Sequence, residues 1–193
     1  MPDRPNLDIP DVNSLAKKLR DIKDFPKPGI IFKDVTPLLA DSAALSLAVE
    51  LLTQPFRSVH IDKVVGAESR GFIFGTAVAR NLSAGFVPIR KPGKLPYKTR
   101  KMSYALEYGT DSLEIHEDAI LPGERILMID DLLATGGTMV ACCDLVKELK
   151  GNIVGVAVLI ELCFLSGRDR FKGIPVHSVI KINGEGPAVA TDF

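Results

Sequence analysis

The stretch ILMIDDLLATGGT, residues 126–138, decides the fold of this chain. Its first four residues are all apolar, which is typical of a strand that is covered on both faces of a sheet. Two acids, Asp130 and Asp131, follow directly, and a turn with two adjacent glycines comes next. Residues 138–150 then show apolar positions at helical spacing. The stretch therefore predicts a buried strand, an acidic end, a glycine turn and a helix.

The glycine turn has the features of an anion site. A helix that begins at the carboxyl end of a parallel strand offers unpaired amides and a partial positive charge. Adjacent glycines let the backbone close around a phosphate, and the two threonine hydroxyls add donors. The expected phosphate-binding residues are Ala134, Thr135, Gly136, Gly137 and Thr138.

The two acids indicate a sugar beside the phosphate. Carboxylates repel phosphate, so we expect Asp130 and Asp131 to face sugar hydroxyls, and the pair of sites suggests a ribose phosphate. A plainer interpretation remains open, because many α/β proteins use Asp and Gly at such turns only to cap a helix. Two other nucleotide loops are excluded. No lysine follows Gly137, and no Gly-x-Gly-x-x-Gly follows a predicted strand.

The rest of the chain alternates predicted strands with predicted helices. Such alternation is typical of an α/β domain with a mostly parallel central sheet that helices flank. The expected strands cover residues 63–67, 86–89, 126–129, 152–162 and 176–182, and the expected helices cover residues 42–54, 72–81 and 138–150. A further helix is expected to start near Asp11 or Asn13, with Leu15, Leu19 and Ile22 on one stripe.

Length and composition limit the classes of protein. The 193 residues fit a single domain, 1–193, and the 46% apolar and 25% charged fractions are ordinary for a globular protein. A formal net charge of zero argues against a nucleic-acid partner. No run reaches the ~20 apolar residues of a membrane span, and the first residues do not resemble a secretory signal. Three cysteines without metal-ligand spacing suggest reduced thiols, and we expect a cytoplasmic protein.

Residues 90–102 form an exposed, mobile loop of one charge sign in this prediction. Its cations are Arg90, Lys91, Lys94, Lys98, Arg100 and Lys101. Residues 104–108 and 113–116 alternate and are expected to pair as a hairpin across 109–111. A generic basic loop is more often a solvated surface. Here the glycine turn and the strand-to-helix turn ESRG, 68–71, also favour anions, so the three features together predict a multiply phosphorylated ligand.

Five motifs in the chain resemble motifs of a known protein family. They are FPKPGIIFKD (25–34), ESRGF (68–72), IRKPGKLP (89–96), LEYG (106–109) and IDDLLATGGT (129–138). The last resembles the phosphoribosyl pyrophosphate motif of the type I phosphoribosyltransferases, and the others resemble the adenine branch of that family. The resemblance spans roughly residues 12–170. Glu68 stands where the branch often has aspartate, and the tail after about residue 173 matches less well.

The resemblance implies a fold and a reaction. The fold would add a small hood, from about residues 25–40 plus part of the C-terminal region, and a flexible catalytic loop at about 92–107. In the reaction, adenine and phosphoribosyl pyrophosphate give AMP and pyrophosphate. Magnesium would be held mainly by ligand oxygens and water, with no direct protein ligand. A homodimer is implied as well, with neither a nucleic-acid nor a membrane partner.

The resemblance also implies residue roles. The catalytic residues would be Glu107, Asp130 and Asp131. Ser69, Arg70, Lys91 and Lys94 would bind pyrophosphate, and a cis peptide would join Glu68 to Ser69. Ile31, Phe32, Lys33 and Leu162 would surround adenine. Tyr104 and Tyr108 would pack the loop or reach the ligand, and simple packing is the favoured interpretation for Tyr104.

Two rival functions remain from the sequence. The same chemistry could serve a 6-oxopurine such as hypoxanthine or xanthine. A non-catalytic regulator could instead sense nucleotides with the same pocket, although the loop cations and Glu107 argue against that alternative.

Overall fold

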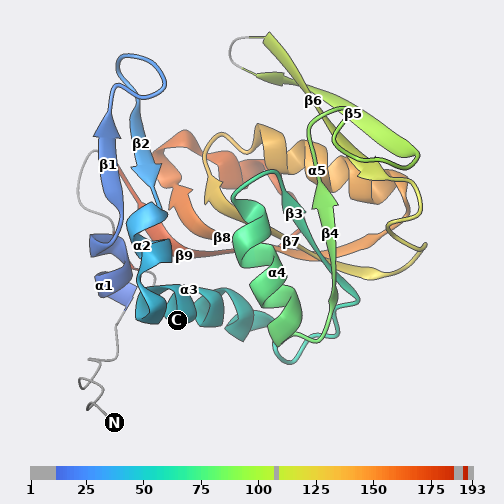
Figure 1. Ribbon diagram of the computed structural model, residues 1–193, viewed down its shortest axis with the longest axis horizontal. Helices are drawn as coiled ribbons and strands as arrows, with labels where there is room; N and C mark the ends of the chain where they lie inside the picture. The colour runs from blue at the N-terminus through green and yellow to red at the C-terminus, as the bar shows by residue number, and fades with distance from the viewer. Residues whose placement is uncertain (1–11, 107–108, 185–188, 191–193) are drawn as a thin grey trace.

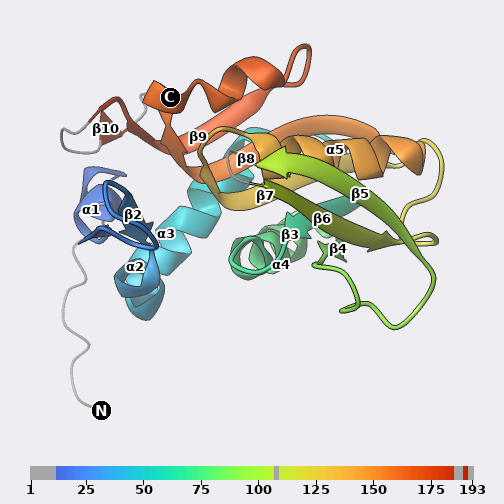
Figure 2. The same ribbon diagram turned by 90° about the horizontal axis from the view of Figure 1, so that it is seen from above.

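A six-stranded sheet forms the centre of the protein in the computed structural model, which describes residues 12–106, 109–184 and 189–190. Five strands are parallel (Figure 1), and β10 joins the edge antiparallel to β9 (Figure 2). The strand order is β10 (Val189–Ala190), β9 (Val176–Ile182), β8 (Asn152–Leu162), β7 (Arg125–Leu133), β3 (Lys63–Ala67) and β4 (Gly85–Ile89). The predicted α/β class with a mostly parallel sheet is confirmed.

Helices cover both faces of the sheet. The helices α3 (Ser42–Thr53) and α4 (Gly71–Asn81) lie on one face and α5 (Gly137–Glu148) on the other (Figures 1 and 2). Alternate residues of β7 therefore enter different cores: Leu127 and Ile129 pack on the α3 and α4 side. Their neighbours Ile126 and Met128 pack on the α5 side, which explains the unbroken apolar run.

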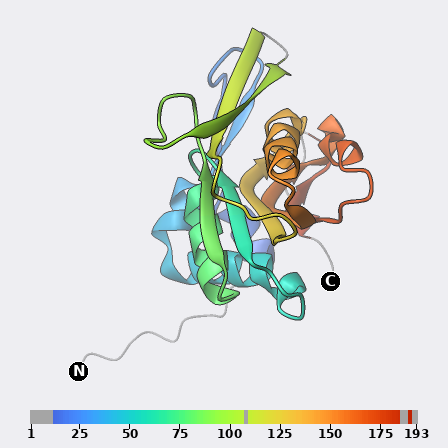
Figure 3. The ribbon, with the colours of Figure 1, turned by 90° about the vertical axis from the view of Figure 1, so that its right-hand side faces the viewer.

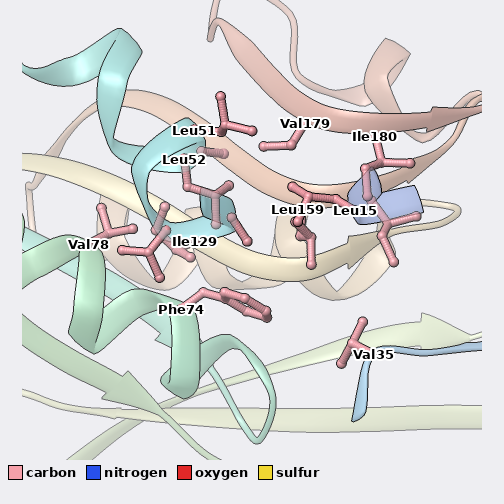
Figure 4. Close-up of a cluster of buried hydrophobic side chains, with 14 of the residues drawn as sticks. Leu15, Val35, Leu51, Leu52, Phe74, Val78, Ile129, Leu159, Val179 and Ile180 are labelled. Carbon is pink, nitrogen blue, oxygen red and sulfur yellow. The ribbon is translucent and has the colours of Figure 1, made fainter. Parts of the chain in front are cut away.

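The core under α3 and α4 is densely filled. Phe74 and Val78 of α4 and Leu52 of α3 are fully buried and converge with Ile129 (Figure 4). Leu15, on the short helix α1 (Val12–Lys17), closes the same cluster at its far end. This packing fixes the position of β7, which carries the two acids and continues to Leu133, beyond the end predicted at residue 129. None of the helices within the described ranges is long and apolar enough to cross a lipid bilayer.

A small hairpin outside the main sheet forms the hood. Here β1 (Arg20–Lys23) pairs antiparallel with β2 (Ile31–Asp34), and the helix α2 (Thr36–Ala40) follows. The predicted helix through Ile22 is wrong, because α1 ends at Lys17 and Ile22 lies opposite Phe32 in the hairpin. Pairing with a distant segment overrides the local helical spacing.

A second hairpin extends from the sheet and packs on α5 (Figure 3). It consists of β5 (Thr99–Leu106) and β6 (Gly109–His116), which pair antiparallel from end to end. The predicted hairpin is confirmed in kind, but β5 begins inside the segment expected to be a mobile loop. Residues 109–111 belong to β6 and not to the turn. Charged side chains at 100 and 101 concealed the alternation that places Met102 and Tyr104 on the core side.

Short 3-10 helices complete the described elements. They are η1 (Gln54–Phe56), η2 (Cys163–Leu165) and η3 (Gly167–Arg170).

Candidate active site

A cavity of about 380 Å³ opens at the carboxyl ends of β3 and β7. These strands are neighbours in the sheet, but the chain leaves them toward opposite edges, and open α/β sheets bind ligands at such a switch point. The lining residues are Glu68, Ser69, Arg70 and residues 130–139. The structure thus brings together nine predicted site residues: Ser69, Arg70, Asp130, Asp131, Ala134, Thr135, Gly136, Gly137 and Thr138.

The glycine turn has a conformation that requires glycine. Gly136 caps α5 with φ of +80°, in the left-handed region. A Cβ atom at this position would also lie only 2.9 Å from the carbonyl oxygen of Gly167. The helix begins at Gly137 without an acid in its first turn, so its unpaired amides face the cavity without a competing carboxylate from the helix itself.

The loop after β8 supports this turn from behind, a feature that the sequence analysis missed. A Cβ atom on Gly167 would stand 2.0 Å from the carbonyl oxygen of Ala134, so the two backbones are in direct contact. The next residue, Arg168, donates to both carboxylate oxygens of Glu161, and the Ser178 hydroxyl also donates to that carboxylate. The one available sequence signal was an acid inside the apolar run of β8.

Glu161 is ionised in spite of its burial. Burial alone would raise its pKa, but the hydrogen bonds from Arg168 and Ser178 outweigh that effect and lower the pKa below its usual range. The buried carboxylate is only 3% exposed and fixes Arg168, which in turn holds the 167–170 segment against the glycine turn.

The two acids differ in exposure, because Asp131 is buried and Asp130 is partly buried. Asp131 is 4% exposed, and its backbone N–H donates to Oδ1 of Asp130 at 2.9 Å. Arg70 Nε lies 2.9 Å from Oδ2 of Asp131, yet the guanidinium N–H bonds do not point along this line. Oδ2 therefore has an ionic neighbour but no hydrogen-bond partner among the described residues.

Burial controls the protonation of this pair. Burial first, and repulsion from Asp131 second, raise the pKa of Asp130 well above its usual range. Burial also raises the pKa of Asp131, although the positive charge of Arg70 opposes the change. Two carboxylates with one cation between them suit a ligand that brings hydroxyl donors and positive charge.

Arg70 links the cavity to the hood. Its guanidinium carbon lies 4.9 Å from the centre of the Phe32 ring, and the Phe25 ring meets Phe32 edge-on at 5.1 Å. The peptide bond between Glu68 and Ser69 is cis, as the resemblance implied.

The four residues predicted for adenine lie outside the cavity lining. Phe32 approaches the cavity through Arg70, whereas its neighbour Ile31 is 39% exposed. The Lys33 amino group pairs with Asp21 Oδ1 at 2.7 Å, and Leu162 is buried at the end of β8. The hood therefore stands beside the cavity and does not wall it.

The predicted loop residues occupy a separate network. The Lys91 amino group pairs with the carboxylate of Asp111, and Lys94 is exposed, its carbonyl accepting from Arg90 at 3.2 Å. The Tyr104 hydroxyl lies 3.3 Å from Oγ1 of Thr138, so this side chain does more than pack. Glu107 and Tyr108 lie outside the described residues.

Comparisons with known proteins agree with this geometry. Residues 35–182 match the family described as phosphoribosyl transferase domain. The adenine phosphoribosyltransferase of Symbiobacterium thermophilum is 57% identical over 164 residues, covering 85% of this chain and 96% of the relative. A crystal structure of the enzyme from Rhodothermus marinus is 53% identical with a TM-score of 0.85, covering 89% and 98% of the two chains.

A yeast structure adds ligands to the comparison. The Saccharomyces cerevisiae adenine phosphoribosyltransferase, crystallised with adenine and an imino-altritol bisphosphate, is 38% identical with a TM-score of 0.81. The match covers 86% of this chain and 97% of the yeast chain.

The parallel sheet, the cavity at its switch point and the family match over residues 35–182 define a phosphoribosyltransferase. Within that class the chain belongs to the adenine phosphoribosyltransferase family, enzymes of purine salvage that form AMP from adenine and phosphoribosyl pyrophosphate. The resemblance found in the sequence is therefore confirmed.

Gly167→Ala should separate the 167–170 segment from the glycine turn. Because the new methyl group overlaps the Ala134 carbonyl, we expect a loss of about 1–3 kcal/mol in the free energy of unfolding. We also expect weaker AMP binding, both measured on the full chain by urea titration and calorimetry. Gly184→Ala is the control, because a Cβ atom there meets nothing within 4 Å. Equal AMP affinity in both variants would contradict a supporting role for Gly167.

Proposed function

We propose that Asp130 and Asp131 bind the ribose hydroxyls of phosphoribosyl pyrophosphate and stabilise the positive charge that develops on the sugar during transfer to adenine. The buried Oδ2 of Asp131, which has no hydrogen-bond partner among the described residues, carries this proposal. A ribose hydroxyl supplies the missing donor. Positive charge at the anomeric carbon favours the ionised form of both acids, where burial otherwise opposes it.

The glycine turn is proposed to hold the 5′-phosphate. The amides at the start of α5 and the hydroxyls of Thr135 and Thr138 are its donors. With the phosphate at one end of the sugar and the acids at its hydroxyl edge, the anomeric carbon is fixed toward β3. The leaving pyrophosphate then meets the residues that follow β3.

Pyrophosphate is proposed to contact Ser69, Arg70, Lys91 and Lys94. Ser69 and Arg70 line the cavity, whereas the two lysines extend from the segment after β4. Their charges balance an anion that the acid pair repels. Arg70 contacts the carboxylate of Asp131 and the ring of Phe32, so it lies between the proposed sugar site and the hood.

Adenine is proposed to bind under the hood, between Phe32 and the end of β8 at Leu162. The apolar faces of Ile31 and Phe32 suit a purine ring, and the backbone of Ile31 and Lys33 can read its edge. The adenine in the 38%-identical yeast enzyme supports this class of base. The segment at 92–107, which contains Tyr104 and is followed by Tyr108, is proposed to close over the sugar and exclude water.

Magnesium is proposed as the cofactor. No group of three or more His, Cys, Asp or Glu side chains in the described ranges could cage a metal ion. The cavity instead offers two carboxylates beside a site for a multiply charged ligand, which fits an ion held mainly by ligand oxygens and water. The ion would neutralise the charge of the pyrophosphate group.

The assembly and location are proposed from the family resemblance. We propose a homodimer, and the exposed neighbouring apolar residues Phe164 and Leu165 of η2 are candidates for its contact surface. We also propose that the enzyme acts in the cytoplasm, which fits its three free thiols. Analytical ultracentrifugation tests the dimer, and a monomer at micromolar concentration would contradict it.

The base preference is tested by pyrophosphate release from phosphoribosyl pyrophosphate. With Mg²⁺ we expect turnover with adenine and a kcat/KM at least ~10²-fold lower with hypoxanthine, because a polar site left unpaired discriminates strongly. Addition of EDTA should stop the reaction. A preference for hypoxanthine would instead support the 6-oxopurine alternative, and binding without turnover would support the regulator.

Asp131→Asn tests the electrostatic role of the acid pair. The amide keeps the shape of the side chain but removes its charge, so we expect kcat to fall on the order of 10²–10³-fold. The measurement is steady-state kinetics, with circular dichroism to verify the fold. Turnover near that of the unmodified chain would refute the assignment.

Glu107 is proposed to move a proton on an adenine ring nitrogen while another ring nitrogen attacks the sugar. This role rests on the match of residues 106–109 to the family motif. Glu107→Ala should lower kcat by ~10²–10⁴-fold, as for a lost general acid or base, and should change the affinity for phosphoribosyl pyrophosphate much less. The reverse pattern would make Glu107 a binding residue.

A further inference from the structure

We infer that Asp111 is a positioning residue that competes with pyrophosphate for the side chain of Lys91. Its carboxylate takes the place of an anionic ligand while the lysine is away from the cavity. Asp111 therefore sets how tightly the enzyme holds pyrophosphate. This inference deepens the proposed function and rests on the assignment of Lys91 to pyrophosphate.

The pair lies at the junction of two elements. Lys91 follows the last strand residues of β4, and Asp111 lies on β6, whose carboxylate Oδ2 contacts the Lys91 amino group. The side chains are 44% and 26% exposed, so the contact is open enough to break. Burial alone would lower the pKa of Lys91, but Asp111, Tyr104 and Glu68 together outweigh it and raise that pKa, while Lys91 lowers the pKa of Asp111. Both groups are therefore charged.

The backbone of Lys91 is fixed while its side chain is free to swing. The Lys91 N–H donates to Oε2 of Glu68 at 3.0 Å, and the guanidinium of Arg90 bridges the same carboxylate. Glu68 itself lines the cavity. A four-carbon stem anchored beside the cavity can thus present its ammonium either to Asp111 or to an anion in the site.

Tyr104 connects the pair to the glycine turn. Its hydroxyl donates to Oδ2 of Asp111 at 3.2 Å and lies 3.3 Å from Oγ1 of Thr138. Thr138 lines the cavity, so the carboxylate of Asp111 lies two hydrogen bonds from the lining, on the side of the proposed 5′-phosphate. The Lys91 backbone is held by Glu68 on the side of the proposed pyrophosphate, so Asp111 and pyrophosphate can compete for the Lys91 ammonium group.

Asp111→Asn tests the competition by the direction of its effect. The amide keeps the shape but loses the charge that attracts Lys91, so pyrophosphate with Mg²⁺ should bind about two- to fivefold more tightly to the full chain, measured by titration calorimetry. A residue that only supported the fold would weaken binding when replaced. Asp111→Ser should raise the affinity for pyrophosphate as well. This variant replaces Asp111→Asn in the test if the asparagine variant does not fold.

Two controls isolate the contact. Asp118→Asn removes one negative charge from an exposed position beyond the end of β6 and should leave the affinity unchanged. Lys91→Ala should weaken pyrophosphate binding, and adding Asp111→Asn to it should have no further effect, because the lysine for which Asp111 competes is already gone.

The outcomes separate the inference from the proposal on which it rests. If Lys91→Ala weakens pyrophosphate binding but Asp111→Asn leaves the affinity unchanged or lowers it, the inferred competition is wrong and the proposed role of Lys91 stands. If Lys91→Ala leaves pyrophosphate affinity unchanged, the assignment of Lys91 is wrong and the inference falls with it. An equal gain in the Asp118→Asn variant would attribute the effect to net charge and overturn the inference.

Discussion

The proximity of two adjacent carboxylates on β7, Asp131 buried and Asp130 partly buried, is the constraint on which the site depends. Charged groups in a protein interior cost free energy unless they find partners, and among the described residues Arg70 pairs with Asp131 and its positive charge acts on both acids. The surrounding fold maintains this arrangement, because apolar cores on both sides of the sheet hold β7 rigidly. The site therefore suits a ligand that brings hydroxyl donors and positive charge to the two acids.

Two features hold the glycine turn in place relative to the two acids. The glycine turn begins α5 at a left-handed residue, and the Gly167 backbone presses on Ala134 from the other side. The ionised Glu161 anchors that second segment through Arg168. Since the acids and the turn belong to one strand-turn-helix unit, a shift of α5 would move the proposed phosphate site relative to the proposed sugar site.

The sequence predicted the centre of the molecule better than its periphery. The stretch 126–138 contains strand, acids, turn and helix within one local segment, so its periodicity and composition predicted their order. They did not predict that β7 continues through the acids to Leu133, which depends on pairing with β8. The hairpin that begins at Arg20 depends instead on pairing with β2, and the contact of Gly167 with Ala134 depends on the return of the chain from β8. Such contacts between distant segments leave no periodic signal. In β5 the cations masked an alternation that becomes evident only once α5 covers one side.

The position of Arg70 has a consequence for how this enzyme diversifies. One guanidinium touches the aromatic ring of Phe32 and the carboxylate of Asp131. A replacement in the hood that moves that ring and with it Arg70 also alters the electrostatic field at Asp131, in the proposed sugar site. Selection for a different nucleobase would therefore act on reaction rate at the same time, and the recognition surface of this scaffold cannot evolve independently of its chemistry.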